Sequence, residues 1–203
     1  MRDLAEAMRV NNSSVFELTD HTFYERDFVF FADLMSYLAK LTGCDEKNAM
    51  EFAKLSQLLY LSSLLHFSLT EKTETTEQLR NEKQMPVLLG DLLYGRFIST
   101  LTETGKNVYL PNYLAYLKQF NRCCIEDLEG RFSFGMTQAA SMLMEQSARV
   151  MAAFAGTEPI ATLYEAELFF AEEWNPRKGD KISSMEELDA LLERTFGQGA
   201  VVC

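Results

Sequence analysis

Apolar residues recur at helical spacing over two long segments near the start of the chain, and this feature constrains the fold more than any other. The first segment, Asp20 to Leu41, repeats apolar residues every three or four positions and is followed by Gly43, a typical helix stop. In the second, Glu46 to about Leu69, apolar residues cover so much of the circumference that other helices must enclose it. The pattern predicts a helical bundle with the second helix at its centre.

Proline, glycine and capping residues divide the rest of the chain into further helices. Each of three prolines suits the first turn of a helix, so we predict helices over Pro86–Thr104, from Pro111 to near Gly130, and from near Thr157 to Trp174 with Pro159 in the first turn. A further helix is predicted over Ser133–Ala155. Thr70–Lys83 is polar and is predicted to be a loop or a frayed helix end with a mobile tip.

The last segment contains a Ser-x-x-Glu capping box at Ser184 and Glu187, which predicts a short final helix ending at Gly197. No segment shows useful strand alternation, so the predicted class is all-α. We expect one domain over residues 1–203, with 1–19 flexible and 176–203 forming a C-terminal capping helix.

Composition limits the classes of function. The chain has 203 residues and 47% hydrophobic content, enough for one core. Its net charge of −11 argues against nucleic acid as a partner. The start lacks a secretory pattern and no apolar run approaches the roughly 20 residues of a membrane span, so a cytoplasmic location is expected. Neither the four cysteines nor the two histidines show metal-ligand spacing.

Three segments, taken in order, resemble the core of the trans-isoprenyl diphosphate synthase family. The first is the S-L-L-H stretch Ser63–His66, which in that family directly precedes an aspartate-rich D-D-x-x-D motif. The second, Val87–Arg96, matches a V-L-x-G-D-x-L-x-x-R-like segment, and the third, Gly135–Ala140, matches a G-K-T-A-like segment except at its lysine. The resemblance implies a single-domain helical bundle of isoprenoid-synthase type, truncated.

The chain departs from the family where the family binds magnesium and diphosphate. The aspartates of the first motif would fall on Phe67, Ser68 and Glu71, so only one carboxylate remains. Glu172 and Glu173 are weak candidates for the second acidic cluster. The diphosphate-binding lysine is replaced by Met136, and Arg80 lacks the usual paired arginine. Because Mg²⁺ needs several carboxylate oxygens, the resemblance implies that this chain holds no cofactor and is not catalytic alone, with Mg²⁺ expected in a catalytic partner.

A degenerate relative of this kind resembles the small subunit of heterodimeric hexaprenyl and heptaprenyl diphosphate synthases, which make the side-chain precursor of menaquinone. The expected partner is a catalytic large subunit, with a homodimer as the form of the chain alone. The family's dimer contact would use the third and fourth predicted helices, and the candidate interface residues there are Leu89, Leu93, Phe97, Tyr113, Tyr116, Leu117 and Phe120. The same residues could instead pack inside the monomer.

The family's prenyl tunnel gives a further expectation, since residues one to three turns before the first aspartate motif line it. The corresponding candidates are Ser56, Leu59, Ser62 and Ser63, whose small serines would leave room for a prenyl chain or would equally permit close helix packing. Two other functions remain open: a stand-alone helical protein that binds a prenyl lipid, and a divergent Mg²⁺-dependent prenyltransferase.

Overall fold

The computed structural model describes residues 23–67 and 77–184, together with 186, 187, 190, 191 and 194, and within them the chain is helical apart from short connections. The elements follow the order β1 (Phe23–Tyr24), α3 (Glu25–Thr42), α4 (Glu46–Phe67), α5 (Glu77–Glu103), η1 (Asn107–Tyr109), α6 (Leu110–Leu128), α7 (Met136–Ala155), α8 (Pro159–Glu173), η2 (Pro176–Lys178) and β2 (Lys181–Ile182). The predicted all-α class is confirmed.

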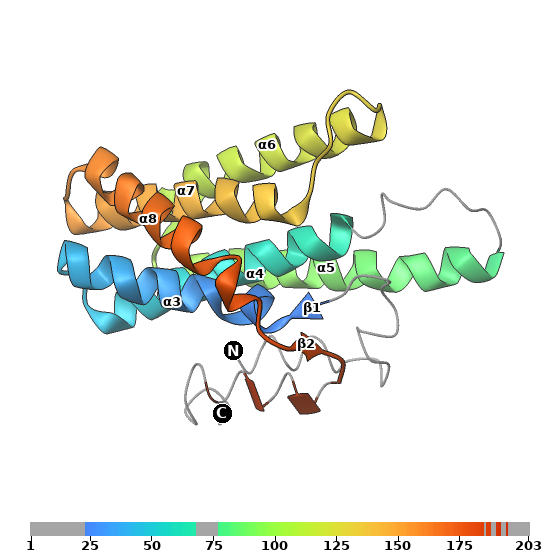
Figure 1. The fold of residues 1–203 in the computed structure, drawn as a ribbon, viewed down its shortest axis with the longest axis horizontal. Helices are drawn as coiled ribbons and strands as arrows, with labels where there is room; N and C mark the ends of the chain where they lie inside the picture. The colour runs from blue at the N-terminus through green and yellow to red at the C-terminus, as the bar shows by residue number, and fades with distance from the viewer. Residues whose placement is uncertain (1–22, 68–76, 185, 188–189, 192–193, 195–203) are drawn as a thin grey trace.

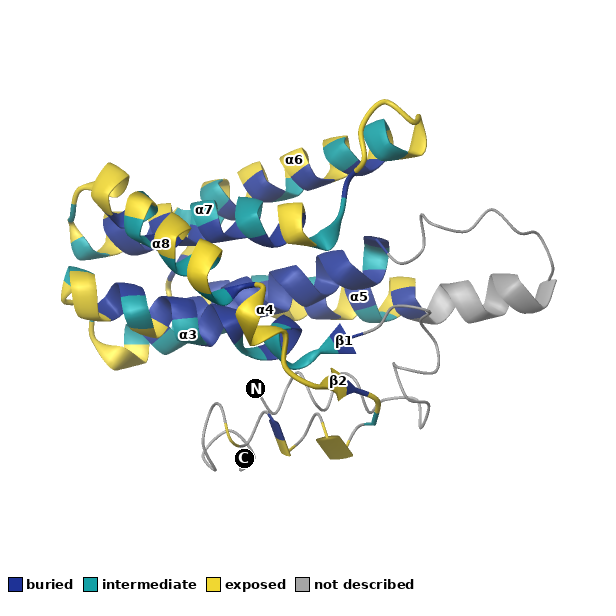
Figure 2. Cartoon of the chain, in the orientation of Figure 1, coloured by how far each residue is buried: buried dark blue, intermediate teal, exposed yellow. Residues whose placement is uncertain are grey.

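Helix α4 lies at the centre of the bundle, in contact with α3, α5 and α7 (Figure 1). Every residue from Leu55 to Leu65 is buried, which appears as an almost continuous dark band in Figure 2. Helix α7 also contacts α3, α6 and α8, and α8 packs against α3 as well. The central position predicted from the apolar pattern of this helix is therefore confirmed.

Local capping interactions explain several helix boundaries that were predicted from sequence. The Asp45 carboxylate accepts a 2.9 Å hydrogen bond from the backbone N–H of Asn48 and caps α4. Gly105 has φ +68° after α5, and the N–H of Lys106 donates to the carbonyl of Leu101, which closes the helix end in a Schellman motif. These contacts involve residues within six positions of one another, so sequence alone could locate them.

The structure corrects the predicted starts of three helices. The first was predicted from Asp20, but α3 begins at Glu25 because Phe23 and Tyr24 form the strand β1. Helix α5 begins at Glu77, so Pro86 lies inside it instead of opening it. The residues between Glu77 and Pro86 are mostly strong helix formers, and the helix continues through the proline. Helix α7 begins at Met136, three residues later than predicted, because Gly135 takes an extended N-cap conformation. The other part of the predicted polar loop, residues 68–76, lies outside the described residues.

A two-residue antiparallel pairing, Phe23 with Ile182 and Tyr24 with Lys181, joins the segment before α3 to the segment after α8. Strands this short cannot show alternation, so the sequence did not predict them.

The predicted capping box lies after this strand pair. Ser184 Oγ accepts a hydrogen bond from the N–H of Glu187, while Glu187 Oε2 accepts one from the N–H of Ser183. The predicted capping box is therefore present with its return bond shifted by one residue. Residues 1–19 lie outside the described part of the chain.

Among the described residues, no helix combines the length and apolar character that a membrane crossing needs.

Candidate functional site

The pairing of α4 with α5 brings together two of the three segments singled out from sequence. Ser62 Oγ donates a 2.8 Å hydrogen bond to the carbonyl of Gly90, and His66 Nε2 lies 3.3 Å from Asp91 Oδ1. A Cβ atom at Gly90 would lie only 2.6 Å from His66 Nε2, so glycine is what allows the imidazole to approach α5 this closely. The S-L-L-H and G-D segments thus form one contact, with His66 and Asp91 partly exposed on its outer side.

The position of the first expected aspartate is occupied by a buried aromatic ring. Phe67 is 5% exposed and its ring centroid lies 5.7 Å from that of Phe134, which in turn packs 5.6 Å from Phe120. Phe134 directly precedes the third segment, so the end of α4 meets the start of α7 through apolar contacts. Ser68 and Glu71 lie outside the described residues.

The second acidic candidates lie at the end of α8, and each has a different environment. Glu172 is exposed, whereas Glu173 forms an ion pair with Arg177, whose guanidinium also lies 2.8 Å from Asp33 Oδ2. A cation already neutralises Glu173, and the two glutamates do not converge on one point. Within the ranges that the structure describes, no group of three or more His, Cys, Asp or Glu could hold a metal ion.

Trp174 joins the end of α8 to the three helices around it. Its ring packs edge-on against Phe30 of α3 at 4.9 Å and against Tyr60 of α4 at 6.0 Å. Its Nε1–H donates to Thr137 Oγ1 in the first turn of α7 at 3.3 Å, and the Arg26 guanidinium lies 4.5 Å from the ring centroid. One side chain thus connects α8 to α3, α4 and α7.

A buried carboxylate is linked to this tryptophan through Tyr60, which contacts both. Asp27 is 5% exposed and accepts hydrogen bonds from the backbone N–H of Tyr24 at 2.9 Å and from the Tyr60 hydroxyl at 3.2 Å. Burial raises the pKa of Asp27 above its ordinary value, although the Tyr24 N–H and the positive charge of Arg26 oppose the rise. Sequence analysis did not single out Asp27, although it lies three and four positions before the apolar Phe30 and Phe31 and therefore on the same side of α3.

The raised pKa predicts how Asp27 affects stability as pH changes. Because the folded protein holds this proton more tightly than the unfolded chain, the contribution of Asp27 is greatest below its unfolded pKa and is lost as pH rises through the folded value. Because asparagine resembles the protonated carboxyl and does not titrate, we expect the stability of Asp27→Asn to rise relative to the wild type between about pH 4 and about pH 7. Denaturant unfolding of both proteins across this range measures the difference, and a difference independent of pH would contradict the prediction.

The four tunnel candidates are all buried, and the three serines take part in hydrogen bonds. Ser56 Oγ lies 2.7 Å from Ser147 Oγ of α7, Ser62 binds the carbonyl of Gly90, and Ser63 donates to the carbonyl of Leu59 within its own helix at 2.9 Å. Leu59 is fully buried in the core. Two of these serines therefore connect α4 to its neighbours, which is the helix-packing role that the sequence left open.

Two tyrosines of α6 face this row of serines. Tyr113 and Tyr116 are fully buried, and neither hydroxyl has a hydrogen-bond partner among the described residues. Burial raises the pKa of each phenol, and the nearby hydroxyls of Ser56 and Ser63 only partly offset the rise. Within the described residues, each phenol is therefore removed from water without an aligned hydrogen bond in return.

This arrangement predicts an unusual response to removing a hydroxyl group. Tyr113→Phe and Tyr116→Phe are expected to leave stability unchanged or to raise the free energy of unfolding by about 1 kcal/mol. Tyr60→Phe is the matched control, because it removes a hydroxyl that donates to Asp27, and it should destabilise. Urea unfolding followed by circular dichroism tests all three. Clear destabilisation by Tyr113→Phe would instead show that the Tyr113 hydroxyl makes a stabilising hydrogen bond.

The candidate interface residues divide between the core and the surface. Leu93, Phe97, Tyr113, Tyr116 and Phe120 are buried within the monomer, and Leu89 and Leu117 are half-buried. These five buried side chains are therefore not accessible to a partner protein. The exposed apolar residues of the same two helices include Val87, Leu88, Leu92 and Leu114.

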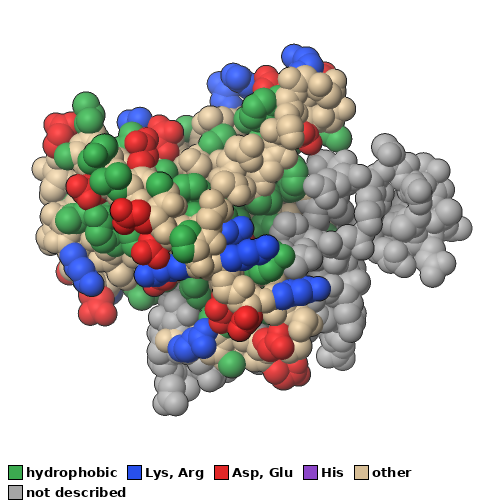
Figure 3. All heavy atoms as spheres, in the orientation of Figure 1, with side chains coloured by type: hydrophobic (Ala, Val, Ile, Leu, Met, Phe, Trp, Pro, Cys, Tyr) green, Lys and Arg blue, Asp and Glu red, His purple; other side chains and the backbone are tan. Residues whose placement is uncertain are grey.

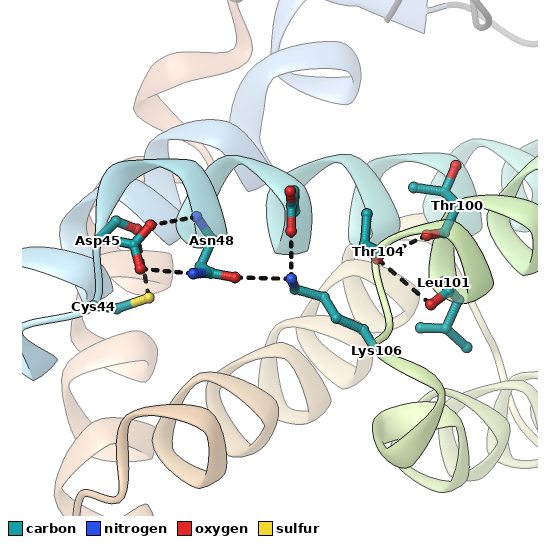
Figure 4. A network of polar contacts seen from close by, with 8 residues as sticks. Cys44, Asp45, Asn48, Thr100, Leu101, Thr104 and Lys106 are labelled. Atoms are coloured by element: carbon teal, nitrogen blue, oxygen red, sulfur yellow. Dashed lines mark hydrogen bonds and ion pairs between the residues drawn. The ribbon is translucent and has the colours of Figure 1, made fainter.

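A buried lysine forms a polar network that sequence analysis did not identify (Figure 4). Lys106 Nζ donates to Asn48 Oδ1 at 2.8 Å and forms an ion pair with Glu51, and it lies 4.9 Å from the ring centroid of Phe52. Asn48 is held in turn by Asp45. Lys106 lies 58 positions after Asn48, so no local pattern signals the contact.

Comparison with known proteins gives the chain no relative. No protein-family model matches it, and neither a curated protein nor a solved structure matches it.

Proposed function

We propose that this chain is the non-catalytic small subunit of a heterodimeric medium- or long-chain trans-polyprenyl diphosphate synthase that makes the side-chain precursor of menaquinone. The observation that carries the proposal is the meeting of the segments that resemble such synthases. Ser62 and His66 contact Gly90 and Asp91, and Phe67 packs against Phe134 beside the third segment. The segments that resemble the family therefore pack together, which supports the proposal.

The residues at the expected metal positions do not fit magnesium. The buried ring of Phe67 offers no oxygen ligand, the Glu173 carboxylate is paired with Arg177, and Met136 replaces the diphosphate-binding lysine. The departure of an allylic diphosphate requires neutralisation of its negative charge. In this proposal the catalytic large subunit supplies that neutralisation, and the small chain supports its activity and product length.

An exposed apolar surface supports the idea of a partner. Val87, Leu88 and Leu92 are 37%, 59% and 39% exposed on α5, and Leu114 is 44% exposed on α6. Two of these leucines lie four positions apart, so they share one side of α5. Apolar surfaces of this kind are typical of permanent subunit contacts. The proposed interface therefore uses the outward residues of α5 and α6 and not those buried in the core.

The test is prenyltransferase activity with farnesyl diphosphate, isopentenyl diphosphate and Mg²⁺. The chain alone and the complete synthase from the same organism are assayed separately and then mixed. We expect long-chain product only from the mixture, together with a 1:1 complex on size-exclusion chromatography. Turnover by the isolated chain would instead establish a divergent prenyltransferase, and saturable binding of farnesol without any partner would favour a prenyl-lipid-binding protein.

Variants on the proposed interface make the test specific. The double change Leu88→Glu and Leu92→Glu should abolish both the complex and the activity of the mixture, because it places two carboxylates in an apolar contact. Leu41→Glu is the matched control, since Leu41 is also an exposed leucine, at 52%, but lies on α3. Equal losses in both variants would contradict the proposed interface.

A further inference from the structure

Helix α8 has an apolar outer face that no described element covers. Ile160, Tyr164 and Leu168 are 77%, 58% and 39% exposed, and their spacing of four places them along one side of the helix. Ala161 and Ala171 are exposed on the same side. These five residues are the α8 stripe. Figure 3 shows hydrophobic side chains interspersed with acidic ones over the region where α8 lies in Figure 1.

The α8 stripe is not needed to hold the helix in place. The opposite side of α8 buries Thr162 and Ala166 against the bundle, and α8 contacts α7 and α3. The Tyr37 hydroxyl donates to Glu165 Oε2 at 2.7 Å, and the Tyr37 ring stacks on Phe169 at 5.0 Å. Because these contacts fix α8, the exposed side chains of the stripe are free for another molecule.

Both edges of the stripe are acidic. At about 100° per residue, Glu167 borders one edge, while Glu165 and Glu172 border the other. Glu167 and Glu172 are exposed. No Lys or Arg occurs from Thr157 to Trp174, so α8 itself provides no cation beside these carboxylates. An apolar band between two negatively charged edges is complementary to an amphipathic helix with positively charged flanks.

We propose that the α8 stripe is a docking surface for a basic amphipathic helix of another protein. Such a partner would place apolar side chains four positions apart on Ile160, Tyr164 and Leu168 and would direct Lys or Arg at Glu167 and Glu172. A second copy of this chain fits less well, because its acidic edges would face those of the first and the net charge is −11. An anionic bilayer is repelled for the same reason. The surface is separate from the proposed subunit contact, which uses α5 and α6.

The probe is a fluorescein-labelled synthetic helix of about 18 residues, or about five turns, with leucines along one face and lysines along both edges. Fluorescence anisotropy with the full chain should show saturable binding that weakens as salt rises, because exposed charge pairs are screened. Tyr164→Ala should weaken binding by about tenfold or more, since a central aromatic side chain carries much of the energy of a contact.

Matched controls distinguish binding at the α8 stripe from non-specific hydrophobic binding. Leu128→Ser changes an apolar residue that is 60% exposed on α6 and should leave binding unchanged. A peptide with glutamates in place of the lysines should not bind. The proposal is overturned if the lysine peptide fails to bind, if Tyr164→Ala and Leu128→Ser behave alike, or if the chain forms dimers that Tyr164→Ala dissociates. Binding to phosphatidylglycerol vesicles that depends on Tyr164 would also overturn it.

Discussion

Replacing Trp174 with alanine is expected to lower the free energy of unfolding by about 3–5 kcal/mol, the range for large aromatic side chains removed from a core. The indole is 1% exposed and packs against Phe30, Tyr60 and Phe170, so its loss leaves a cavity where four helices meet. The change also removes the hydrogen bond to Thr137 and the contact between the Arg26 guanidinium and the indole ring.

Circular dichroism during urea unfolding is the appropriate measurement, since Trp174 is the single tryptophan and its fluorescence disappears in the variant. Trp174→Phe is the matched control, because it keeps an aromatic ring but loses the bond to Thr137, and it should cost about 1–2 kcal/mol. A loss below about 1 kcal/mol for Trp174→Ala would show that α8 is held independently of this side chain.

Replacing Lys106 with alanine is expected to cost about 2–4 kcal/mol, because it removes one partner of a largely buried ion pair and leaves the other unpaired. The Lys106 side chain is 5% exposed and that of Glu51 is 24% exposed, so water can compensate the glutamate only in part. The alkyl part of the lysine is also lost from its place beside Phe52 and Phe154.

Two further variants separate charge from packing at this position. Lys106→Met keeps most of the apolar volume and should lose less stability than Lys106→Ala. Adding Glu51→Gln to Lys106→Met should recover part of that loss, because the carboxylate no longer lacks its cation. Lys118→Ala, at an exposed lysine, should change stability by no more than about 0.5 kcal/mol. If Lys106→Met and Lys106→Ala lose the same amount, packing is not involved.

The α4–α5 contact shows how far sequence reasoning reached for the candidate site. The stretches ending at His66 and beginning at Val87 were identified from residue order, and the structure places Ser62 and His66 directly against Gly90 and Asp91. The sequence also identified Phe67 as an apolar residue at the position where the family has its first aspartate. Its partner Phe134 could not be predicted, because the two residues lie 67 positions apart and meet only through the packing of α4, α6 and α7.

The α5 and α6 residues show where the sequence was ambiguous. Leu93, Phe97 and Tyr113 are apolar or aromatic, as both a core and an interface require, and only their burial separates the two. Pro86 gave a wrong helix start for a different reason. The prediction placed the proline in a first turn, whereas nine helical residues from Glu77 precede it.

The sequence by itself determined the all-α class, the central position of α4 and the helix ends at Gly43, Gly105 and Gly156. These features depend on side-chain period and on contacts between residues a few positions apart, which sequence displays directly. Only the tertiary structure decided that Asp27, Trp174 and Lys106 act as buried junctions and that the α8 stripe stays exposed. Those outcomes depend on how whole helices pack against one another, which brings together side chains that are far apart in the chain.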